Sequence, residues 1–140
     1  MPTNVSHLQY FTKGDNLGFY RDLMGFLGWE TLHDDADQGI IGFGSPDGVS
    51  IWFVGHANDA ANDYDGVGLN HLALGAASIA EVDATVDYLA RSGVPALFET
   101  PRHRPEFAWG EGQTYYQVMF ETPDRLLLEI VYTGPYDGPA

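Results

Sequence analysis

The sequence predicts an α+β protein made of two modules with the same order of elements, β-α-β-β-β. Three observations predict it. A short alternating segment with a histidine at its third position occurs at residues 5–10 and again at residues 69–74. Each copy is followed by a helical pattern, and each module ends in a Pro-Asp turn and a strand-like run. Because neither half would bury its sheet alone, the repeat predicts a single domain over residues 1–140.

The first module covers about residues 4–55. After the first strand, Asp15 can cap a helix whose apolar residues recur at helical spacing and which ends before Gly28. Those apolar residues are Tyr20, Leu23, Met24 and Leu27. The strand-like runs that follow lead to Pro46 and Asp47 and a last strand over residues 49–54. The pattern therefore predicts one helix packed against four strands.

The second module covers about residues 68–133, after a connector at about 56–67 that is rich in Ala, Asn, Asp and Gly. Ser78 and Glu81 form a capping-box pattern at the start of its helix, and residues 93–95, Gly-Val-Pro, end it. Val82, Val86 and Leu89 form the apolar stripe of that helix. Pro123 and Asp124 precede the last strand, which covers residues 126–131.

Composition excludes several classes of protein. Hydrophobic residues make up 44% of the chain, which is enough for a folded core, and no apolar run approaches the roughly 18 residues that a membrane span requires. The net charge of −14 disfavours nucleic acid and anionic lipid as partners. This acidity fits either adaptation to high salt or a solubilising surface. With no cysteine and no leader-like N-terminus, the chain is expected to be soluble and cytoplasmic, with any metal held by His, Asp or Glu.

Strand alternation places three metal-ligating residues on equivalent faces. His7 and His71 occupy matching positions in the two repeats, and Glu129 lies in the last strand of the second module. Aligning the two Pro-Asp turns places Trp52 at the position in the first module that corresponds to Glu129. A carboxylate in a run as apolar as residues 126–132 is costly to bury unless it is paired or binds a cation.

His7, His71 and Glu129 therefore form a candidate site of two histidines and one carboxylate. Such a site suits Fe(II), Mn(II), Ni(II) or Zn(II) and leaves coordination positions open. The alternative is that both histidines are hydrogen-bonded core residues and that Glu129 pairs with an arginine such as Arg125. For each residue alone this alternative is favoured, whereas their joint occurrence at repeat-related positions favours the metal site.

Together with this ligand pattern, residues 16–26, Asn-Leu-Gly-Phe-Tyr-Arg-Asp-Leu-Met-Gly-Phe, resemble the first helix of the vicinal oxygen chelate superfamily. That superfamily includes glyoxalase I, bleomycin-resistance and other antibiotic-resistance proteins, and extradiol dioxygenases. The resemblance covers nearly the whole chain. It implies a cup-shaped, mostly antiparallel sheet with helices on the outer face, a metal at the base of the cup, and a homodimer.

The number of ligands bears on the type of reaction that the resemblance implies. Proteins similar to glyoxalase I supply four ligands, and here Trp52, whose indole cannot coordinate a metal, takes the fourth place. Three ligands resemble the extradiol dioxygenases, which carry a tyrosine on the strand before the Pro turn, near Met119 here. Tyr115 and Gln117 share the strand face of Met119, so Tyr115 could reach the same cavity.

Residues 101–112 are predicted to form a lid over the cup, because arginines, Trp109 and other functional side chains gather in a Gly- and Pro-punctuated segment. His103 within it could act as an acid or base, and a surface loop whose arginines neutralise local acids is the equal alternative. Trp52 could stack on a planar ligand or fill the core. Trp52, Trp109, Gln117 and Met119 are thus expected to line a substrate pocket, with His103 and Tyr115 as catalytic candidates.

Two functions are expected to compete. The first is a divalent-metal-dependent enzyme, a dioxygenase or a lyase or isomerase, that acts on a small substrate with adjacent oxygens. The second is a resistance protein of the bleomycin-resistance type that binds a drug or another small ligand without chemistry. A non-catalytic protein with a vestigial site is a third possibility. The three-residue ligand set favours the enzyme.

Overall fold

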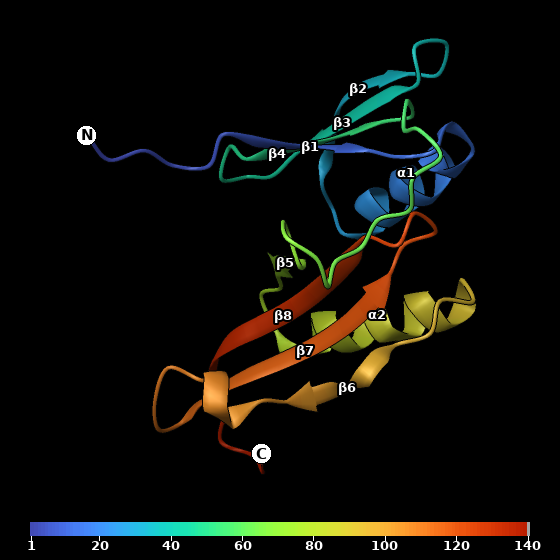
Figure 1. The fold of residues 1–140 in the computed structure, drawn as a ribbon. Helices are drawn as coiled ribbons and strands as arrows, with labels where there is room; N and C mark the ends of the chain where they lie inside the picture. The colour runs from blue at the N-terminus through green and yellow to red at the C-terminus, as the bar shows by residue number, and fades with distance from the viewer. Residues whose placement is uncertain (140) are drawn as a thin grey trace. The chain divides into compact units, whose positions relative to one another are not determined.

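The computed structural model describes residues 1–139, which form two compact units, Met1–Ala61 and the described residues from Asn62 onward. Each unit has the element order β-α-β-β-β, so the predicted α+β class and its two modules are confirmed (Figure 1). Each sheet contains one parallel and two antiparallel strand pairs within this described part of the chain. None of its helices is both long and apolar enough to cross a membrane.

The first unit has a four-stranded sheet in the order β1-β4-β3-β2. Its elements are β1 (His7–Phe11), the 3₁₀ turn η1 (Gly14–Asn16), α1 (Leu17–Phe26), β2 (Glu30–Asp35), β3 (Ile40–Gly44) and β4 (Ser50–Val54). The helix α1 packs on one face of the sheet, where the ring of Tyr20 stacks on Phe53 with centroids 4.3 Å apart. Aromatic burial on this face forms the core of the unit.

Helix α1 begins differently from the sequence prediction. Asp15 lies within η1, and the residue that caps α1 is Asn16, whose side chain makes no capping hydrogen bond. The predicted cap at Asp15 is therefore wrong. The 3₁₀ turn moves the cap from Asp15 to Asn16 and the start of the helix to Leu17, one residue past the expected position.

The second unit has a four-stranded sheet in the order β5-β8-β7-β6. Its elements are β5 (Leu72–Gly75), α2 (Ile79–Arg91), β6 (Leu97–His103), η2 (Pro105–Phe107), β7 (Gln113–Glu121) and β8 (Leu127–Pro135). The capping box is confirmed, because Ser78 Oγ accepts from the amide of Glu81 at 3.2 Å. The Glu81 carboxylate in turn accepts from the amide of Ala77 at 2.7 Å.

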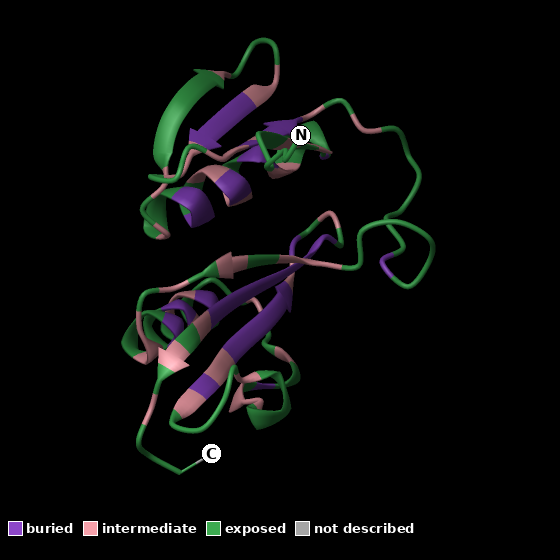
Figure 2. Ribbon diagram, turned by 90° about the vertical axis from the view of Figure 1, so that its left-hand side faces the viewer, coloured by how far each residue is buried: buried purple, intermediate pink, exposed green. Residues whose placement is uncertain are grey.

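Strands β7 and β8 carry buried residues on both faces of the sheet (Figure 2). One face packs on α2 through Val118, Phe120, Leu128 and Ile130, which pair with one another across the two strands. The opposite face carries Met119 beside Glu129 and Gln117 beside Val131. Because side chains of paired residues on neighbouring strands point to the same face, Gln117 and Glu129 both lie on this second face.

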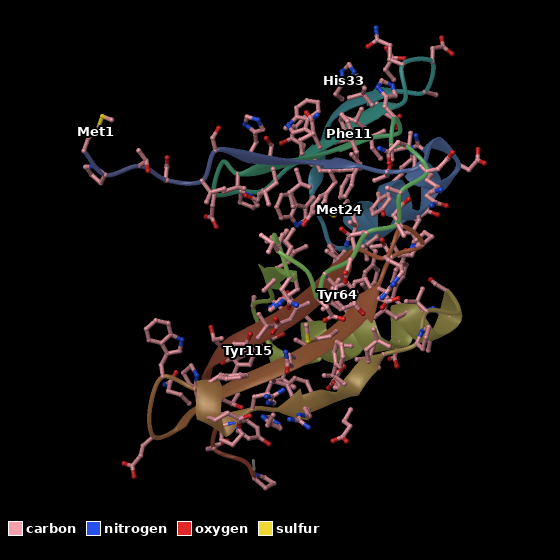
Figure 3. The ribbon with its side chains drawn as sticks, viewed as in Figure 1. Met1, Phe11, Met24, His33, Tyr64 and Tyr115 are labelled. Atoms are coloured by element: carbon pink, nitrogen blue, oxygen red, sulfur yellow. The ribbon has the colours of Figure 1, made fainter. Side chains whose placement is uncertain are left out.

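The predicted connector does not form a free segment. Asn62 to Asn70 belong to the second unit, and Tyr64 is buried in a cluster with Met119, Leu127 and the partly buried Leu97. Figure 3 labels Tyr64 in the second unit together with Tyr115, which lies on β7. Residues 62–70 are held by the same sheet that carries Glu129.

Half of the residues in the predicted lid at 101–112 belong to regular structure. Its first three residues end β6, and residues 105–107 form η2. The register of β6 against β7 shifts between Leu97 and Arg102, where Phe98 and Glu99 have positive φ angles of 58° and 61°. Beyond the shift Arg102 pairs with Gln117 and His103 with Tyr116, so these two β6 residues face opposite sides of the sheet.

Candidate metal site

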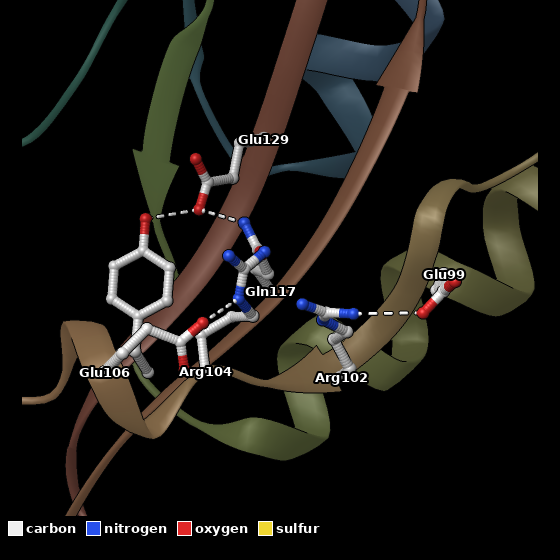
Figure 4. A network of polar contacts seen from close by, with 7 residues as sticks. Glu99, Arg102, Arg104, Glu106, Gln117 and Glu129 are labelled. Carbon is white, nitrogen blue, oxygen red and sulfur yellow. Dashed lines mark hydrogen bonds and ion pairs between the residues drawn. The ribbon is translucent and has the colours of Figure 1, made fainter.

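Glu129 is the buried carboxylate around which the candidate site is built. Its side chain is 1% exposed in the middle of β8. Its Oε1 atom accepts hydrogen bonds from the Tyr115 hydroxyl at 2.5 Å and from Gln117 Nε2 at 2.7 Å (Figure 4). Two donors on one oxygen stabilise the buried charge and fix the plane of the carboxylate.

The other oxygen of Glu129 faces His71. His71 precedes β5, which runs parallel to β8 with Ala73 opposite Glu129. Alternation therefore turns His71 to the Glu129 face, as predicted, and its Nε2 lies 3.1 Å from Glu129 Oε2. The His71 side chain is 36% exposed, so the pair lies at the edge of the buried region and not inside it.

Asn70 determines which nitrogen of His71 carries a proton. Asn70 Nδ2 donates to the backbone carbonyl of Tyr64 at 2.9 Å, which leaves Asn70 Oδ1 facing His71 Nδ1 at 2.7 Å. An amide oxygen only accepts, so His71 must be protonated at Nδ1. In neutral His71 the lone pair on Nε2 then points at the carboxylate.

Both atoms are then acceptors, so a shared proton is one group that can lie between His71 Nε2 and Glu129 Oε2. A metal ion fits equally well, since N and O ligands about 2.1 Å from one ion and about 90° apart lie about 3 Å from each other. The observed 3.1 Å agrees with two neighbouring ligands of a single ion.

The third predicted ligand, His7, lies in the first unit at the start of β1. It is exposed, and the register with β4 places it on the same sheet face as Trp52. Among residues 1–139, no group of three His, Asp or Glu side chains is arranged to hold an ion. His71 and Glu129 are thus brought within 3.1 Å of each other, and metal binding by these two residues and by His7 stays a prediction.

The predicted pairing of Glu129 with Arg125 is not what the structure shows. Arg125 lies 3.9 Å from Glu121, and its guanidinium lies over the ring of Tyr64 at 5.4 Å. Glu129 is instead bound by Tyr115, Gln117 and His71. That alternative reading of Glu129 is wrong, because the turn before β8 directs Arg125 elsewhere.

Tyr115, Gln117 and Met119 lie on the Glu129 face of β7, as their spacing predicts. Gln117 is 3% exposed and Met119 is 8% exposed. Burial, followed by the hydrogen bond to Glu129, raises the pKa of Tyr115 well above its ordinary value. The Tyr115 hydroxyl therefore keeps its proton and acts as a donor at neutral pH.

Arg104 is a member of the site that sequence reasoning did not single out. Its Nη1 donates to Gln117 Oε1 at 3.3 Å, its Nε donates to Glu106 at 2.6 Å, and its guanidinium lies 4.7 Å from the Phe107 ring centroid. The hydrogen bond from Arg104 holds the pKa of the Glu106 carboxyl below its ordinary value. A signal was present, because residues 102 and 104 hold two of only six Lys and Arg residues in the chain.

Two predicted site residues are not brought to Glu129. His103 lies on the opposite, α2-side face, where its Nδ1 lies 2.6 Å from Thr114 Oγ1 and its ring stacks on Tyr136 at 4.4 Å. Trp109 is 87% exposed in the loop after η2. The odd or even position of a residue in β6 after the register shift could not be read from the sequence.

Trp52 lies in the first unit, half-buried against its own sheet. Its indole Nε1 donates to Ser50 Oγ at 3.0 Å, and its ring lies 6.0 Å from that of His33. A side chain at Gly42 would place its Cβ 2.4 Å from the indole, so the ring lies flat on the backbone of β3. Trp52 therefore covers its sheet, and its place in a substrate pocket stays a prediction.

Solved structures of other proteins share the fold of this chain. A candidate glyoxalase from Bacillus halodurans is 27% identical to this chain, with a TM-score of 0.73 over 91% of this chain and 94% of that one. The fosfomycin resistance protein FosX of Listeria monocytogenes shares the fold at 21% identity, with a TM-score of 0.66 over 94% of each chain. A FosX variant has been crystallised with Mn(II) and a dihydroxypropylphosphonic acid.

The sequence comparisons agree with the structural ones. The uncharacterized protein YqjT of Bacillus subtilis is 43% identical over 65 residues, a stretch that covers 46% of this chain and 47% of YqjT. The chain thus matches about half the length of that relative. The sequence profile of the Glyoxalase/Bleomycin resistance protein/Dioxygenase superfamily matches residues 13–130, and this chain belongs to that superfamily.

Proposed function

We propose that this protein is a divalent-metal-dependent enzyme of the glyoxalase or dioxygenase type that acts on a small substrate with adjacent oxygens. One observation carries the proposal. The Nε2 atom of His71 and the Oε2 atom of Glu129 lie 3.1 Å apart with their other polar atoms already engaged. Such a pair is prepared for a cation and is expensive to bury without one.

His7 is proposed as the third ligand, because it is the repeat-related counterpart of His71. It would come from the first unit of the same chain or from that of a second copy in a homodimer. Mixing His7→Ala with His71→Ala protein distinguishes the two sources. Recovery of metal binding in the mixture would show a site shared between two chains, and no recovery would show a site within one chain.

A bound divalent ion would act as a Lewis acid toward two neighbouring oxygens of the substrate. Fe, Mn, Ni and Zn all accept this ligand set. The residues of the chain supply the surroundings: Tyr115 and Gln117 orient Glu129, and the Tyr115 hydroxyl keeps a proton beside the ligand. His103 has no part in the proposed chemistry, because it lies on the other face of the sheet.

The position and charge of Arg104 favour a substrate that carries an anionic group. It is one hydrogen-bonded residue away from Glu129, through Gln117, and is a positive charge in a chain whose net charge is −14. Its carboxylate partner Glu106 is half-exposed, and ion pairs of this kind contribute little stability. A carboxylate, phosphate or phosphonate on the substrate could therefore replace Glu106.

The first test is metal content. Protein purified without chelator or a metal-affinity tag is expected to hold about one divalent ion per chain, measured by elemental analysis, or to take one up on titration with Mn(II) or Zn(II). Glu129→Gln is expected to lower metal affinity by a large factor with the fold intact. An amide at this position keeps an oxygen for Tyr115 and Gln117 but cannot replace the charged Oε2.

Circular dichroism of the Glu129→Gln variant serves as the folding control. Iron in the protein would direct assays to catechol cleavage, whereas nickel or zinc would direct them to isomerase and lyase reactions. An unchanged metal content in the variant, or no uptake of any of the four ions by the wild type, would overturn the proposed ligands.

Ligand sequestration without chemistry is the second candidate function, and the aromatic ring of Trp52, which is only partly buried, favours it. Under that function, Trp52→Ala would abolish binding of an aromatic ligand while Glu129→Gln would leave it unchanged. Trp109→Ala is the matched control, since Trp109 is 87% exposed and lies in a loop of the other unit. Under the metal-enzyme proposal, Glu129→Gln would weaken ligand binding more than Trp52→Ala would.

A further inference from the structure

The segment that precedes His71 is anchored on the sheet that carries Glu129. Tyr64 is 9% exposed and packs with Met119 and Leu127, and its hydroxyl donates to Glu121 on β7. Met119 is the register neighbour of Glu129. The backbone of Tyr64 is therefore held at a defined place relative to the carboxylate.

Asn70 connects this anchor to His71. The carbonyl of Tyr64 can only accept, so the contact at 2.9 Å fixes Nδ2 of Asn70 on that side and Oδ1 on the side of His71. The position and the orientation of the Asn70 amide thus both follow from the placement of Tyr64. The amide in turn holds the proton of His71 at Nδ1.

The corresponding contact of His7 imposes no such restriction. Its Nδ1 lies 3.4 Å from Ser6 Oγ, and a hydroxyl can both donate and accept. The two repeat-related histidines therefore differ. His71 is set to present Nε2 to a cation, whereas the contact with Ser6 leaves His7 free to exchange tautomers.

We propose that Asn70 is a positioning residue of the metal site, and that the anchored segment from Tyr64 to Asn70 sets His71 in the tautomer that presents Nε2 to the ion. This inference rests on the proposed function. It assigns a role to a segment whose first part, up to residue 67, the sequence pattern marks only as a connector. Loss of an oriented partner of a metal-bound histidine typically costs about 10–100-fold in metal affinity.

Metal affinity is the first measurement. Asn70→Ala is expected to raise the dissociation constant for Zn(II) by about 10–100-fold, measured by competition with a chromophoric chelator. Asn62→Ala is the matched control, because Asn62 Nδ2 also donates to a backbone carbonyl, that of Arg125, at 2.8 Å, but does not contact His71. The control is expected to bind Zn(II) as the wild type does. Asn70→Asp, which keeps an acceptor for the Nδ1 proton, is expected to restore most of the affinity.

The state of the His71 ring is the second measurement, and it needs no activity. Nitrogen-15 spectra of the Zn(II)-loaded protein are expected to show Nε2 of His71 bound to the ion and a slowly exchanging proton on Nδ1. In metal-free protein, compared at one pH, the same Nδ1 proton is expected to exchange slowly in the wild type and Asn62→Ala. It is expected to exchange quickly in Asn70→Ala.

The two measurements separate this inference from the proposed function. If the wild type binds none of the four ions, the proposed function fails, and the metal-free exchange rates still decide whether Asn70 holds the Nδ1 proton. If the wild type binds metal but Asn70→Ala binds it equally well with an unchanged Nδ1 proton, the proposed role of Asn70 is wrong while the metal site stands. A loss of affinity shared equally by Asn62→Ala would show general loosening of the segment and would also overturn the role.

Discussion

At the scale of single residues, the two oxygens of Glu129 have different surroundings. Oε1 accepts two hydrogen bonds, from Tyr115 and Gln117, while Oε2 faces His71 alone. The sequence predicted the shared face of these residues from strand parity. It did not predict the contact of Arg104 with Gln117, because Arg104 reaches Gln117 from a turn whose path depends on the backbone after β6.

Tyr115→Phe tests the oriented carboxylate. Removal of the hydroxyl is expected to lower the free energy of unfolding by about 1–3 kcal/mol, because a buried charged acceptor loses a donor. Metal affinity is expected to fall by about tenfold as well. Urea unfolding and Mn(II) titration measure the two effects.

Tyr132→Phe is the control for this prediction, since Tyr132 lies on β8 but its hydroxyl donates to the exposed carbonyl of Pro135. It is expected to leave metal affinity unchanged. Equal effects of the two substitutions on affinity would show that the Tyr115 hydroxyl does not act through Glu129.

At the scale of elements, local sequence signals predicted the second module better than the first. The capping box at Ser78 and Glu81 forms as expected, because both of its hydrogen bonds lie within one turn of chain. The start of α1 depends instead on a 3₁₀ turn, and no capping pattern in the sequence predicts that turn. The face of His103 was missed for a similar reason, since the register shift in β6 arises between Leu97 and Arg102 and changes which residues point outward.

Ser78→Ala and Asp15→Ala compare the two helix starts directly. Ser78→Ala is expected to lower the free energy of unfolding by about 1 kcal/mol, because the amide of Glu81 loses its acceptor. Asp15→Ala is expected to change it by less than half as much, since Asp15 does not cap α1. Chemical unfolding followed by circular dichroism measures both, and a larger effect at Asp15 would contradict the structure of that turn.

At the scale of the whole molecule, the chain combines a strong negative charge with two units of the same element order. The repeat made the fold predictable, because one pattern occurring twice constrains the order of all its elements.

Removal of metal is expected to lower the stability of the whole protein. An ion present at about 100 times its dissociation constant stabilises the folded state by about 2.7 kcal/mol. A chelator is therefore expected to lower the Tm of the metal-loaded wild type by about 5–10 °C. Differential scanning calorimetry measures this, and Glu129→Gln, which lacks the site, is expected to show no shift when chelator is added.

The hydrogen bonds on Glu129 Oε1 also affect how many coordination positions the protein would occupy. With both lone-pair directions of that oxygen used by Tyr115 and Gln117, the carboxylate is limited to monodentate binding through Oε2. A bidentate carboxylate would take an additional position. Tyr115 and Gln117 would thus leave a coordination position of the ion open for a chelating substrate. The denticity of Glu129 would then be set by two residues that do not contact the metal.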